Sequence, residues 1–265
     1  MAENALSPIL AYKADEIAAL RPQAADLRAK AADRPTPRSF LGAITADADR
    51  GGAFICEFKR KSPSGGDIRP GAAPAQIAEA YEAAGATALS ILTDGPSFGG
   101  GLSDLQSAKA ACRLPVLRKD FMIDPLQVIE ARAYDADAIL IILGAVSDGL
   151  AQDLEGQADA LGLAVLAEAH NQDELDRAIS LRTALIGINN RDLTRLETDL
   201  STTEKLAEHV PDNRLLITES GVRTAEDVRR LKRAGARGYL VGEHLLRQSE
   251  IEKATSTLIS AARQD

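Results

Sequence analysis

Lysine, glutamate and asparagine side chains recur in this sequence at one kind of position, the end of a short apolar run. Lys119 follows one such run and Glu168 follows another. The full set is Glu57 with Lys59, Lys119, Glu168, Asn189 and Glu219. An ammonium group can stabilise a developing alkoxide and deliver a proton, and carboxylates can exchange protons at neutral pH. Any one of these residues alone could be a solvated strand end or a salt-bridge partner, but the set as a whole favours acid–base catalysis.

Strand alternation predicts where the first two of these residues point. Side chains of a strand alternate between its two faces, so Ile55, Glu57 and Lys59 share one face and Cys56 and Phe58 the other. A charged pair inside a packed core is costly unless it lies at an open mouth. Glu57 and Lys59 come at the carboxyl end of the run, which is the catalytic end of parallel barrels. We therefore expect Glu57 and Lys59 in a cavity and Cys56 in the core.

Eight apolar runs suggest the architecture that would bring these residues together. The runs are Ala53–Phe58, Ala88–Leu92, Pro115–Arg118, Ala138–Leu143, Leu163–Ala167, Leu185–Ile188, Leu215–Ile217 and Gly238–Val241. Helix-like stretches separate them, including Ala75–Ala84, Pro125–Tyr134, Gln172–Leu181 and Ala225–Ala234. Asp124-Pro125 and Thr224 are helix-start signals, and several stretches stop at Gly. This repeat predicts an α/β fold, a (β/α)8 TIM barrel. An open doubly wound sheet is less favoured, because no GxGxxG follows the first run.

Residues 1–50 precede the first strand and read as an N-terminal helical extension. One or two helices are expected there, at Pro8–Leu20 and Gln23–Ala32, followed by a connection through Pro35 and Pro37. No linker divides the chain, so residues 1–265 are expected to form a single barrel domain. Hydrophobic residues make up 45% of the chain and aromatics 3%, which suits a core of Ala, Leu, Ile and Val.

Charge and cysteine content limit the possible partners. The formal net charge of -8 argues against nucleic-acid binding, and an anionic substrate would need a local basic pocket. Two cysteines, Cys56 and Cys112, cannot make a disulfide framework, which favours a cytoplasmic location. No apolar run is long enough for a signal peptide or a membrane span. We expect no membrane partner, and a monomer or weak homo-oligomer.

Two glycine-containing turns after the last two strands predict a phosphate site. The turns are Glu219-Ser220-Gly221 and Val241-Gly242-Glu243. In barrels of this class, backbone N–H groups and a helix N-terminus after strands seven and eight commonly bind phosphate. Ser220, Gly221, Gly242 and Glu243 are therefore candidate phosphate ligands, with a short helix expected to begin near Glu243. Lys59 would supply the positive charge. The predicted ligand is a phosphorylated small molecule.

Several segments make the chain resemble the indole-3-glycerol-phosphate synthase family of tryptophan biosynthesis. In order, they are Cys56-Glu57-Phe58-Lys59-Arg60-Lys61-Ser62-Pro63-Ser64, Leu117-Arg118-Lys119-Asp120-Phe121, Leu166-Ala167-Glu168, Gly187-Ile188-Asn189-Asn190-Arg191-Asp192-Leu193 and Thr218-Glu219-Ser220-Gly221. The resemblance runs from the N-terminal helices to the last strand. It implies a carbon–carbon lyase that closes the ring of 1-(2-carboxyphenylamino)-1-deoxyribulose 5-phosphate with loss of carbon dioxide and water.

The resemblance also implies roles for the polar residues. Lys119 would protonate the ketone oxygen, Glu168 would handle the proton steps of dehydration, and Glu57 and Lys59 would pair nearby. How these proton transfers divide among Glu57, Lys59 and Glu168 stays open. Asn189 and Glu219 would orient groups by hydrogen bonds.

The same resemblance marks substrate-binding positions. They are Ser62, Phe98, Phe121, Leu140, Arg191, Leu193 and Leu240. The apolar members would flank the aromatic ring, and plain core packing is the alternative for each. Arg191 would hold the anthranilate carboxylate or pair with Asp192. Glu243 stands where the family often has a small polar residue, so its carboxylate is expected to point away from the phosphate.

Two other functions compete with this one, and neither fits as well. A phosphoribosylanthranilate isomerase-like barrel uses a Cys and an Asp as its acid–base pair, where this chain has Glu57 and Asn189. A non-catalytic ligand-binding barrel would be expected to lack Lys119 or Glu168. No His, Asp or Glu cluster has metal-ligand spacing, so we expect no metal and no cofactor. For His170, a helix-start or surface role is favoured over one in the site.

Overall fold

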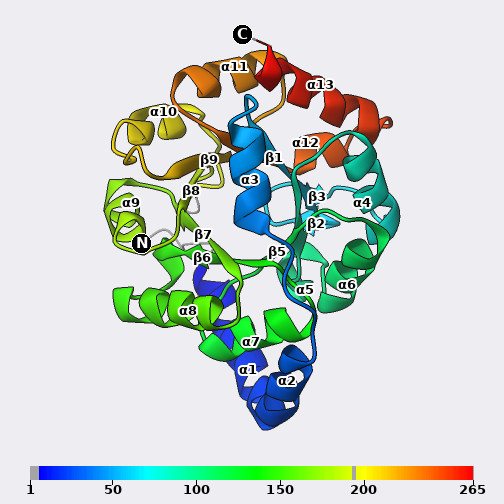
Figure 1. Cartoon of the computed structure of the whole chain (residues 1–265), viewed down its shortest axis with the longest axis vertical. Helices are drawn as coiled ribbons and strands as arrows, with labels where there is room; N and C mark the ends of the chain where they lie inside the picture. Colours follow the sequence, from blue (N-terminus) through cyan, green and yellow to red (C-terminus); the bar gives the residue numbers. More distant parts are fainter. Residues whose placement is uncertain (1–5, 193–194, 265) are drawn as a thin grey trace.

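A computed structural model describes residues 6–192 and 195–264 and shows a closed barrel of parallel strands (Figure 1). The strands are β1 (Ala53–Phe58), β4 (Ala88–Leu92), β5 (Val116–Lys119), β6 (Ala138–Ile142), β7 (Ala164–Ala169), β8 (Leu185–Asn189), β9 (Leu215–Glu219) and β10 (Gly238–Val241). Each pairs with its neighbours in parallel, and β1 closes the barrel by pairing with both β4 and β10. This confirms the (β/α)8 barrel and excludes the open sheet.

Helices form the outer layer around the strands (Figure 1). The longer ones are α4 (Pro74–Ala83), α6 (Leu102–Ala111), α7 (Pro125–Ala133), α8 (Asp148–Ala160), α9 (Gln172–Ile179), α10 (Ser201–Ala207), α11 (Ala225–Arg233) and α13 (Ile251–Arg263). Shorter elements are α5 (Gly95–Phe98), α12 (Glu243–Leu246) and the 3-10 turns η1 (Arg21–Gln23) and η2 (Leu143–Ala145). Capping boxes at Asp124 and Thr224 begin α7 and α11, as the start signals predict.

The core has two principal layers because strand side chains alternate. Phe54, Cys56 and Phe58 point outward and pack under the helices, so the prediction for Cys56 is confirmed. Ala53 and Ile55 point into the barrel, where they meet the inward side chains of the other strands. Both cysteines are free thiols. The described part of the chain contains no helix long and apolar enough to cross a membrane.

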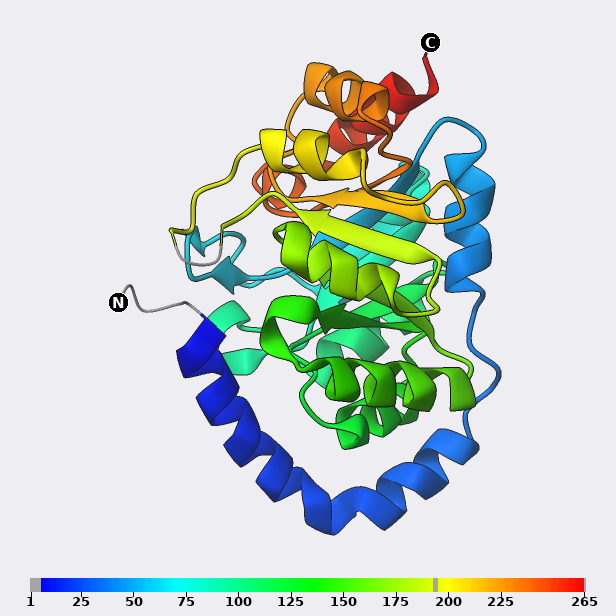
Figure 2. The ribbon, with the colours of Figure 1, turned by 90° about the vertical axis from the view of Figure 1, so that its left-hand side faces the viewer.

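The N-terminal extension contains three helices, α1 (Leu6–Leu20), α2 (Ala24–Ala32) and α3 (Phe40–Ala48). The prediction of one or two helices is therefore wrong in number. Figure 2 shows α1 and α2 running along one side of the barrel, with α3 at the opposite end from the hairpin β2 (Lys61–Ser62) and β3 (Gly66–Asp67). Phe40 and Ile44 of α3 join the interior core at the amino ends of the strands. Leu6 and Ile9 of α1 join the same core.

Candidate active site

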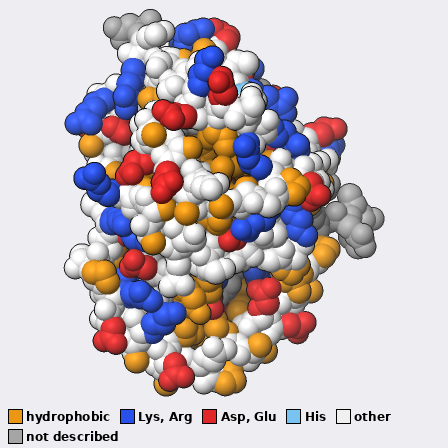
Figure 3. Space-filling view, turned by 90° about the vertical axis from the view of Figure 1, so that its right-hand side faces the viewer, with side chains coloured by type: hydrophobic (Ala, Val, Ile, Leu, Met, Phe, Trp, Pro, Cys, Tyr) orange, Lys and Arg blue, Asp and Glu red, His pale blue; other side chains and the backbone are white. Residues whose placement is uncertain are grey.

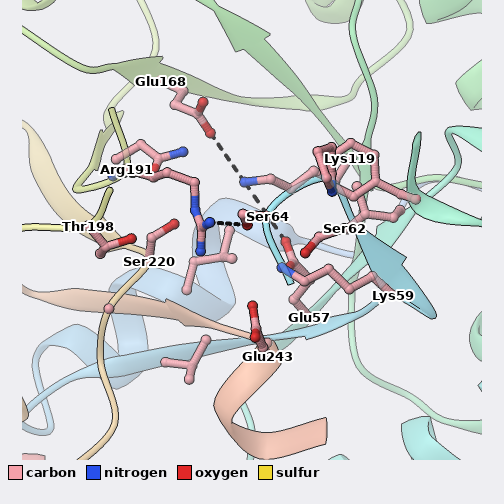
Figure 4. Close-up of a pocket in the computed structure, with 18 of the residues that line it drawn as sticks. Glu57, Lys59, Ser62, Ser64, Lys119, Glu168, Arg191, Thr198, Ser220 and Glu243 are labelled. Atoms are coloured by element: carbon pink, nitrogen blue, oxygen red, sulfur yellow. Dashed lines mark hydrogen bonds and ion pairs between the residues drawn. The ribbon is translucent and has the colours of Figure 1, made fainter. Parts of the chain in front are cut away.

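A cavity of about 480 Å³ opens at the carboxyl ends of the strands, where the sequence places the polar residues. Figure 4 shows the side chains of Glu57, Lys59, Lys119 and Glu168 converging on it, the first two from the end of β1 and the others from β5 and β7. The predicted residues that line it are Glu57, Lys59, Ser62, Phe98, Lys119, Phe121, Leu140, Glu168, Asn189, Arg191, Ser220, Gly221, Leu240, Gly242 and Glu243. Leu193 lies outside the described residues, and the wall does not include Glu219.

Lys119, at the end of β5, is surrounded by carboxylates from three other strands. Its Nζ lies 2.5 Å from Glu219 Oε2, 3.2 Å from Glu168 Oε2 and 4.0 Å from Glu57 Oε2. Burial alone would lower the pKa of Lys119, but the attraction of Glu219, Glu168 and Glu57 outweighs it and holds the pKa above its ordinary value. The site therefore presents a fixed ammonium group to the cavity.

Glu168 and Glu219 have opposite protonation preferences although both are buried. Burial raises the pKa of Glu219 to about 8, and the neighbouring charge of Glu168 adds to this against the pull of Lys119. Burial acts the same way on Glu168, but Lys119 and His170 overcome it and hold the pKa of Glu168 well below its usual range. The pair therefore takes up its first proton on Glu219 rather than on Glu168, and the carboxylate that lines the cavity is the one that stays ionised.

Glu219 lies beneath Lys119, fully buried, and does not reach the cavity. A Cβ atom at Gly187 would come within 2.4 Å of Glu219 Oε1, so the absence of a side chain on β8 makes room for this carboxyl group. Glu219 can act on the reaction through the position of Lys119.

Glu57 and Lys59 form the expected pair, with Lys59 Nζ donating to Glu57 Oε1 at 2.5 Å. Glu57 is 3% exposed and packs against the backbone of the last strand–helix turn. A Cβ atom at Gly242 would lie 2.6 Å from Glu57 Oε1 and 2.8 Å from Glu57 Cβ. Gly242 therefore leaves the space that Glu57 occupies, which is a role the sequence does not reveal.

The apolar wall combines predicted and unpredicted residues. Phe98 and Phe121 lie with ring centroids 6.1 Å apart and planes tilted by 36°. Leu6 and Ile9 of α1 extend this wall over the cavity. The sequence marks neither residue as part of the site, although the three-residue spacing between them is typical of the apolar stripe of a helix.

A buried charge cluster holds α1 beside Lys119. Lys13 is 2% exposed, and its Nζ lies 2.8 Å from Asp120 and 3.0 Å from Asp94. Asp120 directly follows Lys119 and also binds Arg118 at 3.0 Å. The carboxyl pKa of Asp120 is lowered, because Arg118 and Lys13 outweigh the effect of burial. This cluster ties the N-terminal helix to the strand end that carries Lys119.

The opposite end of the cavity contains the two predicted phosphate turns. Ser220 and Gly221 both have positive φ, 64° and 89°, and α12 begins at Glu243, as the sequence predicts. The Glu243 carboxylate accepts a hydrogen bond from Arg247 Nε at 3.0 Å. Arg247 also donates to the carbonyl of Gly65 in the β2–β3 hairpin at 2.9 Å. The negative charge of Glu243 is thus balanced by an arginine that sequence analysis did not identify.

Arg191 and the serine segment meet across the mouth of the cavity. Arg191 Nη1 donates to Ser64 Oγ, and Asn189 Oδ1 accepts from the backbone N–H of Arg191 at 3.1 Å (Figure 4). Ser62 Oγ accepts from the N–H of Gly65 at 3.0 Å and so closes the hairpin turn. Among the described residues, no group of three or more His, Cys, Asp or Glu side chains is arranged to hold a metal ion.

His170 is not a surface residue, so that part of its expected role is wrong. Its side chain is 8% exposed and contacts carboxylates on both sides. Its backbone N–H does bind Glu174 in the first turn of α9, which agrees with a helix-start role.

The barrel and this site define a class of protein, the (β/α)8-barrel enzymes that use an ammonium group and carboxylates at strand ends. The family model of indole-3-glycerol phosphate synthase matches residues 6–258. The indole-3-glycerol phosphate synthase of Hyphomonas neptunium is 50% identical over 259 residues, covering 96% of this chain and 97% of that protein. That of Rhodospirillum rubrum is 53% identical over 237 residues, covering 89% and 90%. The chain belongs to the indole-3-glycerol phosphate synthase family, a family of carboxy-lyases in tryptophan biosynthesis.

Solved structures show the same fold at low sequence identity. The (S)-3-O-geranylgeranylglyceryl phosphate synthase of Thermoplasma acidophilum aligns with a TM-score of 0.58 at 16% identity, covering 84% of this chain and 98% of that chain. A mandelate oxidase aligns with a TM-score of 0.60 at 15% identity, covering 90% and 92%. These similarities support the barrel.

Proposed function

We propose that this chain closes the ring of 1-(2-carboxyphenylamino)-1-deoxyribulose 5-phosphate to give indole-3-glycerol phosphate. The observation that carries the proposal is the position of Lys119. Its ammonium group is fixed by carboxylates at the end of a strand and faces a cavity with an apolar wall on one side and glycine turns on the other. An aromatic ring, a ketone and a phosphate can be placed in that order across such a cavity.

Ring closure requires a proton donor at the ketone oxygen. The ring carbon that bears the carboxylate attacks the ketone carbon, and the carbonyl electrons move to oxygen. Lys119 stabilises this charge and transfers the proton, so the oxygen becomes a hydroxyl group. The same ring carbon then loses carbon dioxide, and the electrons of the broken bond restore the aromatic ring.

Dehydration needs an acid for the departing hydroxyl group and a base for the proton on the neighbouring carbon. Glu168 is ionised and lines the cavity, so it is suited to accept that proton. The Glu57–Lys59 pair lies at the end of the facing strand and can act as the acid that protonates the departing hydroxyl group. Asn189 orients its neighbour Arg191 by a hydrogen bond. Glu219 orients Lys119 in the same way.

Substrate binding divides between the two ends of the cavity. Phe98, Phe121, Leu140 and Leu240 flank the aromatic ring. Arg191 is suited to the anthranilate carboxylate, because its guanidinium lies at the cavity mouth and donates to the neutral hydroxyl group of Ser64. Ser62 shapes the hairpin beside it. Leu193 is retained as a proposed contact from the sequence.

The phosphate is proposed to bind the backbone N–H groups of Ser220, Gly221, Gly242 and Glu243, with Lys59 as the counter-charge. Arg247 balances the Glu243 carboxylate, so this carboxylate adds no net negative charge at the phosphate end of the cavity. The mutual pairing of Glu243 and Arg247 supports the expectation that the carboxylate stays off the phosphate.

The test is appearance of the indole chromophore when the purified protein meets the named substrate. We expect turnover by the wild type and a loss of at least about 10²-fold for Glu168→Gln, the scale of a positioned acid or base. No indole product from folded wild-type protein would refute the proposal. Substrate without its phosphate should react poorly, and equal rates for both would refute the phosphate site.

We also propose that residues 1–265 act as one domain, since α1 contributes both wall residues and Lys13 to the site. The proposed reaction needs no bound cofactor. A cytoplasmic location is supported by two free, buried thiols. Basic and acidic side chains are interspersed over the face in Figure 3, which is consistent with no nucleic-acid partner there. A monomer or weak homo-oligomer is proposed, and gel filtration would test it.

A further inference from the structure

His170 comes two residues after Glu168, at the end of β7, so strand alternation places both side chains on the same face. Its Nε2 lies 3.3 Å from Glu168 Oε1. The other Glu168 oxygen, Oε2, lies 3.2 Å from Lys119 Nζ. The wall of the cavity does not include His170. His170 can therefore influence the reaction only through Glu168.

The second ring nitrogen of His170 faces another carboxylate. Nδ1 lies 2.9 Å from Glu174 Oε2. An imidazole with carboxylates at both nitrogens is satisfied only when both nitrogens carry hydrogen, which is the protonated cation. Burial opposes that charge, but Glu168 and Glu174 outweigh it and raise the pKa of His170 to about 10.

Glu174 is itself held in place. Its Oε1 accepts from Asn171 Nδ2 at 2.9 Å, and its Oε2 accepts from the backbone N–H of His170 at 2.9 Å. It lies in the first turn of α9, where the helix dipole favours a negative charge. Glu174 therefore fixes the ring of His170, and this holds the buried Nε2 at ion-pair distance from Glu168.

We infer that His170 and Glu174 are positioning residues that keep Glu168 ionised and oriented through the reaction. The need arises when Lys119 transfers its proton to substrate, because the resulting neutral amine no longer balances the Glu168 charge. The imidazolium remains after that step. Glu168 then stays a carboxylate and is ready to take the proton of dehydration. This inference rests on the proposed function of Lys119 and Glu168.

Other charged groups around Glu168 do not replace this contact. Lys119 reaches it from β5, Glu219 lies beside it on β9, and Glu57 of β1 reaches it only through Lys119. Among these residues, Lys119 is the only cation, and it is the group that gives up its proton. The residues that shift the protonation of His170 are Glu168 and Glu174.

Two variants test the inference by kinetics. His170→Gln keeps a hydrogen-bond donor but removes the charge. We expect kcat to fall about ten-fold with KM within about two-fold, and the acidic limb of the pH–rate profile to move up by about one pH unit. Glu174→Gln leaves His170 with one carboxylate, so activity should now be lost as the pH rises through about 7. Asp173→Asn, an exposed neighbour in the same turn, is the matched control and should keep the wild-type profile.

The inference is overturned if both folded variants keep the wild-type kcat and pH profile, or if only KM changes. Titration of the His170 ring by NMR, assigned by comparison with His170→Gln, needs no substrate and tests it even if that variant folds poorly. We expect the ring to titrate near pH 10 in the wild type and lower in Glu174→Gln. A wild-type value near 6.5 would overturn the inference. Wild-type protein with this titration but no turnover would instead refute the proposed function.

Discussion

A single methyl group on Gly242 should impair catalysis through Glu57. The backbone of Gly242 has φ of −131° and ψ of −77°, and a methyl group added there meets the side chain of Glu57. The added Cβ atom would lie 2.6 Å from Glu57 Oε1 and 2.8 Å from Glu57 Cβ. A clash with Cβ cannot be relieved by rotation of the carboxylate alone, so β1 or the turn after β10 must move.

The size of the effect follows from that displacement. Overpacking of this kind costs about 1–3 kcal/mol of stability. A shift of roughly 1 Å in a catalytic group can lower the rate by about 10²-fold. We expect kcat for Gly242→Ala to fall between about ten-fold and 10²-fold, because Glu57 and its partner Lys59 are displaced together. We also expect KM to increase, because the shifted turn would weaken the proposed contact between the Gly242 N–H and the phosphate.

Steady-state kinetics with the phosphorylated substrate, together with thermal melts, measures both effects. The control is Gly156→Ala, in the interior of α8, where an added Cβ meets nothing within 4 Å. It should leave kcat unchanged and stabilise the protein by about 0.5–1 kcal/mol. If Gly242→Ala raised KM and the inhibition constant of inorganic phosphate but left kcat intact, the reasoning about Glu57 would be refuted.

Lys119→Met should lower kcat by at least about 10²-fold in a folded protein, and near wild-type turnover would contradict its assignment as the acid. Lys13→Ala should lower the free energy of unfolding by about 3–5 kcal/mol in urea titrations, because buried Asp94 loses its ion-pair partner and Asp120 keeps only Arg118, and a change below about 1 kcal/mol would count against that cluster. The folded-state pKa of His170 lies above its ordinary value of 6.5, so the stability it adds over His170→Gln is full below about pH 6.5 and disappears as the pH rises to about 10; a melting difference that stays constant with pH would disagree. Activity should survive exhaustive EDTA treatment, and loss restored by added Mg²⁺ or Zn²⁺ would contradict a metal-free mechanism.

Local sequence patterns contain enough information to predict the barrel. β1, β4 and β10 begin and end where their apolar runs do, because buried parallel strands read as continuous apolar segments bounded by polar turns. Helix α3 was missed for a complementary reason. It contains Gly42 and Thr45, and no side chain caps its first turn, so its local propensity is weak. It is stabilised by burying Phe40 and Ile44 against the barrel, which no local pattern reveals.

The site was predictable to the extent that it depends on strand alternation. The two-residue alternation of a strand places Glu57 and Lys59 on one face, and in the structure these two side chains form an ion pair. Contacts between distant segments were not predictable. Lys13 reads as an ordinary surface lysine of an amphipathic helix, and only the folded chain brings it to Asp94 and Asp120. The contact of His170 with both Glu168 and Glu174 likewise depends on the turn between β7 and α9, which positions the ring.

The seam where β1 meets β10 has a consequence for how the protein folds. Ala53 faces Gly238 there, and the rings of Phe54 and Tyr239 stack with centroids 4.9 Å apart. Nearly the whole barrel separates these partners in the chain, so the seam can form only after the last strand has been synthesised. Until then the sheet has two unpaired edges, which invite pairing with other chains and make the open intermediate the stage most prone to aggregation. Glu57 and Gly242 lie on opposite sides of this seam, so catalytic competence should be acquired at barrel closure, after most of the secondary structure has formed.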